Sequence, residues 1–193
     1  MKTRSFGAAA LVAAGALGFF TLTASGQDNM GGQAGTATKA KMGSVSAADK
    51  KFAMNAARGG IAEVEAGKLA ADKATSDTLK AYGQQMVDEH TAANDKLKTI
   101  AEGKGLILPT APAAKDAAAI AKMSKLSGAA FDRAYKKFAV ISHMDAYKVF
   151  STEVSMGKDS DIKGFAKETL PTVKMHLTHA KQFAGKRAMT HKM

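Results

Sequence analysis

The strongest constraint on this fold is an apolar stripe that repeats with the period of an α-helix. Between residues 79 and 100, apolar or small residues recur at alternating gaps of four and three, which places them on one helix face. Such a face packs against neighbouring helices. The stripe consists of Leu79, Gly83, Met86, His90, Ala93, Leu97 and Ile100. His90 is therefore a titratable group at the centre of a surface that is predicted to be buried.

Similar stripes predict four long helices and one short helix. The chain has no Trp, 3 Pro and 6% aromatic residues, a composition typical of closely packed helices. Serine N-caps and glycine stops place the long helices at 46–74, 76–102, 127–157 and from 160 onward, with the short helix at 115–126. The links within the first and last pairs are short enough to require antiparallel neighbours. We therefore predict an all-α fold, an antiparallel four-helix bundle with the short extra helix between the second and third long helices.

The first 26 residues have the pattern of a secretory signal peptide. A basic start precedes an apolar run, and small residues stand before a suitable cut at Gln27. We expect an exported protein, periplasmic or associated with the cell envelope, and N-terminal sequencing of the exported form checks the cut. Residues 27–45 lack periodicity and are predicted to be a disordered linker, followed by the bundle domain at 46–187 and a flexible tail at 188–193.

Four polar residues, one from each long helix, are expected to meet at mid-length of the bundle. Glu63, His90, His143 and His176 each lie about halfway along their predicted helix, and midpoints coincide whichever way neighbouring helices run. They fit a metal site for zinc, copper or nickel, or a buried network in which Glu63 accepts hydrogen bonds from the imidazoles. The absence of Cys excludes a disulfide framework and a cysteine-ligated zinc ion.

Three segments resemble an uncharacterised family of exported bacterial domains. They are FAMNAARGGIAEVEAGKLAADKATSDTLKAYGQQMVDEHTAANDKL, LSGAAFDRAY and GFAKETLPTVKMHLTHA, in this order. The family is commonly labelled "putative outer membrane protein" and is assigned to the ferritin-like superfamily, and the match covers about residues 49–184. The resemblance implies a ferritin-like four-helix bundle, and it implies no function, because none is established for the family.

Two departures limit what the resemblance implies. Members of the family tend to carry Asp directly before the histidine of the third long helix, where this chain has Ser142. A ferritin-type di-iron centre needs Glu three residues before His on two helices, and valines occupy those positions here: Val87, Val140 and Val173. We therefore do not expect a ferroxidase or di-iron oxidase. No hydrolase or phosphate-binding motif is present either, so the sequence favours a protein without enzyme activity.

The formal net charge of +11 supports an alternative function. A non-enzymatic envelope or stress protein of this charge would bind anionic envelope components or a protein partner. Nucleic acid is not an expected ligand, because the basic residues are not interleaved with aromatic ones. The sequence leaves the oligomeric state and the choice between these functions open.

Overall fold

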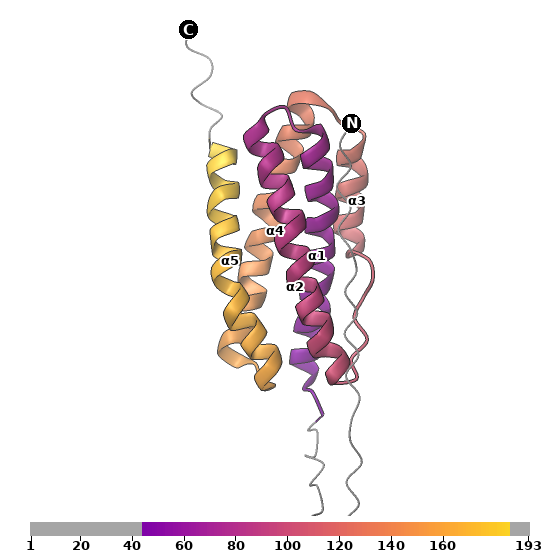
Figure 1. The fold of residues 1–193 in the computed structure, drawn as a ribbon, viewed down its shortest axis with the longest axis vertical. Coiled ribbons are helices and arrows are strands. Elements are labelled where there is room, and N and C mark those ends of the chain that lie inside the picture. Colours follow the sequence, from indigo (N-terminus) through magenta and orange to yellow (C-terminus); the bar gives the residue numbers. More distant parts are fainter. Residues whose placement is uncertain (1–43, 186–193) are drawn as a thin grey trace, which may run out of the picture. The chain divides into compact units, whose positions relative to one another are not determined.

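The computed structural model describes residues 44–185 of the chain. Within them the chain forms five α-helices and no strand, which confirms the all-helical prediction (Figure 1). Their bounds are α1 Ala47–Lys73, α2 Asp77–Gly103, α3 Ala114–Ser124, α4 Gly128–Met156 and α5 Ser160–Gly185. None of these helices is long and apolar enough to cross a membrane. The predicted signal peptide, nearly all of the predicted linker and the predicted tail lie outside the described residues.

Side chains fix the helix starts. The Oγ atoms of Ser46 and Ser76 each accept the backbone N–H three residues ahead, at 3.1 and 3.2 Å. Each bond satisfies one of the donors that the first turn of a helix leaves open. Val45, just before the first cap, packs against the core. At α5 the cap is Asp159, one residue before the predicted start, which accepts from the backbone of Ile162 at 3.1 Å.

The long connection between α2 and α4 makes these two helices run in the same direction. Short turns at 74–76 and 157–159 join two antiparallel pairs, α1 with α2 and α4 with α5. Thr75, just after α1, donates its backbone N–H to Asp132, near the start of α4, at 3.1 Å. α1 and α4 are therefore antiparallel. Between α2 and α4 the chain returns along the length of the other helices through α3 (Figure 1).

The core consists of two apolar clusters with polar residues at their boundary. The first cluster includes Leu79, Tyr82, Met86, Phe131 and Tyr135. The second includes Phe52, Leu97, Phe150, Ile162 and Phe165. At the boundary between them lie Glu63 of α1, His90 of α2, His143 of α4 and His176 of α5. Because apolar packing on both sides excludes water, the polar atoms in this layer need partners within it.

Asp49 ties α1 to the turn between α4 and α5. Its two carboxylate oxygens accept the backbone N–H groups of Lys158 at 3.0 Å and Asp159 at 3.1 Å. The neighbouring Glu153 is buried, and its Oε1 has no hydrogen-bond partner among the described residues. Burial, together with the charge of Asp49 and a hydrogen bond to it, raises the pKa of Glu153 to about 7. The folded state therefore favours the protonated form of Glu153, which can donate to Asp49.

Replacing Glu153 with Gln is expected to stabilise the protein at about pH 8 by about 1–3 kcal/mol, and to have little effect at about pH 4. The Glu153 carboxyl has a pKa near 4.5 when unfolded and about 7 when folded. The stability that its proton provides is therefore complete below the unfolded pKa and is lost as the pH rises through the folded pKa. The amide of the Glu153→Gln variant would keep a donor toward Asp49 at every pH. Urea unfolding of both proteins between these pH values measures the difference, and a difference that does not change with pH would contradict the prediction.

Candidate metal centre

Three imidazoles meet inside the helical domain, one each from α2, α4 and α5. One ring nitrogen from each of His90, His143 and His176 lies within 4.8 Å of the other two. The ring centroids are 5.3, 5.4 and 5.5 Å apart. His143 and His176 are 1% exposed, and His90 is half-buried. The three rings therefore surround one small volume within the polar layer.

Each of these histidines has one buried ring nitrogen without a hydrogen-bond partner among residues 44–185. These atoms are Nε2 of His90, Nε2 of His143 and Nδ1 of His176. In His143 and His176 the second ring nitrogen makes a hydrogen bond. Nδ1 of His143 donates to the carbonyl of Ala139 at 2.8 Å, and Nε2 of His176 donates to the Glu89 carboxylate at 2.8 Å. These bonds leave the other nitrogen of each ring as a lone-pair acceptor, which is the form that binds a metal ion.

Burial keeps the rings of His90 and His176 neutral. It lowers the pKa of His90 well below its usual value, and the neighbouring rings of His143 and His176 lower it further. The pKa of His176 falls to about 4 through burial and the proximity of His143, although Glu89 opposes the shift. At neutral pH each of these two rings therefore has one unprotonated nitrogen. A metal ion can bind its lone pair without competing with a proton.

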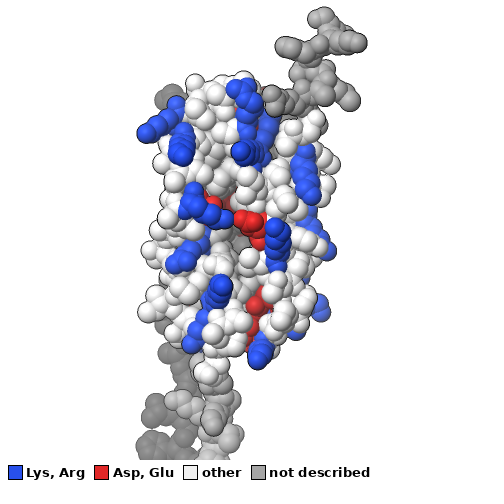
Figure 2. Space-filling model, turned by 180° about the vertical axis from the view of Figure 1, so that it is seen from behind, with Lys and Arg blue, Asp and Glu red and all other residues white. Residues whose placement is uncertain are grey.

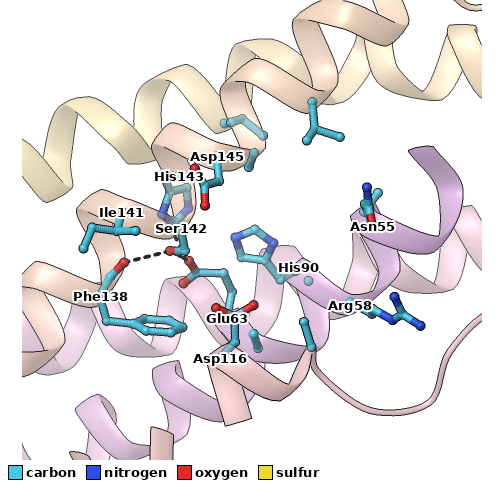
Figure 3. A pocket seen from close by; sticks show the side chains of 18 of the residues that line it. Asn55, Arg58, Glu63, His90, Asp116, Phe138, Ile141, Ser142, His143 and Asp145 are labelled. Atoms are coloured by element: carbon cyan, nitrogen blue, oxygen red, sulfur yellow. Dashed lines mark hydrogen bonds and ion pairs between the residues drawn. The ribbon is translucent and has the colours of Figure 1, made fainter. Parts of the chain in front are cut away.

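Glu63 lies beside the cluster and contacts the side of His143 that faces away from the unpartnered nitrogen. Its Oε1 is 3.3 Å from Nδ1 of His143 and accepts a hydrogen bond from Ser142 (Figure 3). Its Oε2 is buried without a partner among the described residues. Burial raises the pKa of the Glu63 carboxyl, and the effects of His143 and Ser142 oppose this rise. Glu63 is thus placed to orient His143, and it is not one of the three groups whose ligand atoms converge.

Comparison with known proteins identifies a family. Residues 34–183 match the sequence profile of DUF4142, a domain of unknown function. The chain belongs to the DUF4142 family. No curated protein matches the chain. Membership agrees with the resemblance to an uncharacterised domain family and brings no function with it, whereas the ferritin-like assignment and export of this DUF4142 protein stay predictions.

Two solved structures resemble the DUF4142 domain in fold. A DUF305 fragment from Deinococcus radiodurans aligns with a TM-score of 0.66 and 9% identity, over 74% of this chain and 99% of that one. A conserved hypothetical protein from Mycobacterium tuberculosis aligns with a TM-score of 0.56 and 15% identity, over 70% of this chain and 96% of that one. At these identities the similarity concerns the fold alone, so the DUF4142 site has to be interpreted from its own residues.

Two contacts in the DUF4142 site are not among the sequence predictions. Glu89 directly precedes His90, so it points about 100° away from it around α2 and reaches His176 on α5. Ser142 directly precedes His143 and reaches Glu63 on α1. In both cases the polar residue stands next to a histidine of the cluster and faces a neighbouring helix. This position is the only sequence signal that could have identified Glu89.

The spacing of the three nitrogens fits a metal ion after a small contraction. A point equidistant from three atoms 4.8 Å apart lies about 2.8 Å from each, and imidazole nitrogens bind zinc at about 2.0–2.1 Å. Each nitrogen would have to move by less than about 1 Å, which small side-chain rotations provide. Three imidazoles with one open coordination position suit zinc, copper or nickel. The DUF4142 domain can therefore supply a mononuclear site.

Proposed function

We propose that this domain binds one transition-metal ion through His90, His143 and His176. The observation that carries the proposal is the convergence of three buried ring nitrogens that have no hydrogen-bond partner among the described residues. Each unsatisfied buried polar atom costs about 1–3 kcal/mol, and one metal ion would satisfy all three. Zinc, copper and nickel are the candidate ions, because imidazole suits them and the chain has no thiolate.

A hydrogen-bonding network without metal is less well supported. Nε2 of His143 and Nδ1 of His176 both act as acceptors, because the other nitrogen of each ring is already the donor. Two acceptors cannot bond to each other. The one contact between Glu63 and a histidine of the cluster is that with His143, at 3.3 Å. We therefore assign Glu63 the role of holding His143 in place, as outer partners of metal-binding histidines commonly do.

The architecture proposed for this site is a ferritin-like four-helix bundle. It is supported by two antiparallel helix pairs joined through a single long connection, which is a known arrangement of such bundles. The valines that precede the three histidines favour a mononuclear site over a di-iron centre. Export through the N-terminal segment would place this site in the periplasm or at the cell envelope. We propose metal binding or metal handling there, and no enzymatic reaction.

Elemental analysis tests the proposal. Untagged protein, exported with its own leader and purified without chelator, is expected to contain about one metal ion per chain. His143→Ala should lose the ion, because two imidazoles alone bind transition metals weakly. His179→Ala is the matched control and should keep it, because His179 lies one turn beyond His176 and outside the cluster. Parent protein that stays metal-free after incubation with zinc, copper and nickel would contradict the proposal.

A further inference from the structure

A pocket of about 750 Å³ adjoins the histidine cluster. All five helices contribute to its lining, and its volume falls in the range of small-molecule sites. Its walls are largely apolar and include Leu97, Phe138, Val149, Phe165 and Val173. Walls of this kind favour the hydrocarbon part of a small organic molecule, because burying apolar surface is what stabilises such a complex.

Two histidines of the proposed metal site and the neighbouring Glu63 belong to the pocket lining. These histidines are His90 and His143, whereas His176 does not line the pocket. Figure 3 shows the Glu63 carboxyl and the His90 ring pointing into the pocket from α1 and α2. Glu63 is 3% exposed, and its Oε2 has no partner among residues 44–185. Because two of the three histidines line the pocket, a metal ion held by them would adjoin it.

Basic residues outnumber acidic ones in the lining. Besides the buried Glu63, five Lys or Arg and two Asp residues line the pocket: Arg58, Lys115, Lys122, Lys137 and Lys148, with Asp116 and Asp145. Lys115 is paired with Asp145 at 2.9 Å. Figure 2 shows more Lys and Arg than Asp and Glu over the face that is turned away from the viewer in Figure 1. Such a surplus attracts anions and raises their local concentration.

We propose that the pocket binds an amphipathic carboxylate, whose head group coordinates the metal ion and whose hydrocarbon chain lies along the apolar walls. The inference rests on the proposed function, because the metal ion supplies the charge that makes burial of a carboxylate favourable. The head group lies at the ion rather than among the surface lysines, because an ion held by three neutral imidazoles keeps a positive charge that a buried carboxylate can neutralise.

Binding of the head group can be detected with cobalt(II) loaded into the mature full-length protein. The visible absorption spectrum of cobalt(II) changes when one of its ligands changes. Decanoate is the probe, and it is expected to change this spectrum saturably at about one equivalent. Shorter carboxylates should bind more weakly, by up to about fourfold for each methylene removed. Decanol has the same chain without the charge, and it should leave the spectrum unchanged.

Two glycine variants test the location of the chain. Gly59 lines the pocket, and a Cβ added there meets no heavy atom within 4 Å. Gly59→Leu should therefore fill part of the pocket, weaken decanoate binding at least about tenfold and leave cobalt stoichiometry unchanged. Gly164→Leu is the matched control, because Gly164 is equally open and does not line the pocket. It should bind decanoate as the parent does.

The possible failures are distinguishable. If the protein binds cobalt through the three histidines but decanoate does not change the cobalt spectrum, this inference is wrong and the proposed function stands. If the protein binds no stoichiometric cobalt, both are wrong. Equal decanoate binding by the metal-free protein would show that the head group does not need the ion, and undiminished binding by the Gly59→Leu variant would show that the chain lies elsewhere. Either result would overturn the inference.

Discussion

Saturating zinc is expected to raise the melting temperature of the parent protein by about 10–15 °C, and a chelator should reverse the shift. Free metal at a thousand times its dissociation constant stabilises the folded state by about 4 kcal/mol. For a domain of this size, each kcal/mol raises the melting temperature by about 3–4 °C. His143→Ala should remove the shift, because His143 supplies one of the three converging nitrogens. Thermal unfolding monitored by circular dichroism measures the effect.

His90→Leu is a sharper test of metal binding, because the sign of its effect on the melting temperature depends on whether metal is present. In metal-loaded buffer the variant should melt far below the parent, since it cannot be stabilised by the ion. In metal-free buffer it should be neutral or more stable, because Leu fills an apolar face and needs no hydrogen-bond partner, whereas Nε2 of His90 is buried without one among the described residues. A variant that is equally destabilised with and without metal would argue for a purely structural role of His90. His179→Ala should behave like the parent in both buffers.

Gly83→Ala is expected to destabilise the protein by about 2–3 kcal/mol, although Ala has the higher helix propensity. Gly83 of α2 lies against α1, where an added Cβ would meet the Gly67 carbonyl oxygen, the Ala71 nitrogen and the Ala70 Cβ, each at 2.8 Å. Two of these atoms belong to the backbone and cannot rotate away. The two helices would therefore have to separate, and packing around Met86 would be lost.

Gly164→Ala is the control for this substitution. Gly164 lies inside α5, and a Cβ added there meets no heavy atom within 4 Å. The same chemical change should therefore stabilise the protein by about 0.5–1 kcal/mol through helix propensity alone. Urea unfolding of both variants provides the comparison. If Gly83→Ala proved as stable as the parent, the close contact between α1 and α2 would be wrong.

The sequence by itself determined the helices. Apolar spacing of four and three residues, serine caps and glycine stops depend on neighbouring residues in the chain, so they predict the observed helices to within a few residues. The same spacing placed His90, His143 and His176 on buried faces at about the same level. The last long helix begins at Ser160, as predicted, and Asp159 provides its cap.

Only the tertiary structure decided how these helices use their polar residues. One residue along a helix changes direction by about 100° and height by about 1.5 Å, which is smaller than the error of boundaries predicted from sequence. The sequence therefore could not establish that Glu63 lies behind His143, that Glu89 holds His176, or which ring nitrogens stay free. The direction of α4 and the contact between Gly67 and Gly83 depend on packing between distant segments. The pocket beside the cluster has the same origin, because it exists only where all five helices meet.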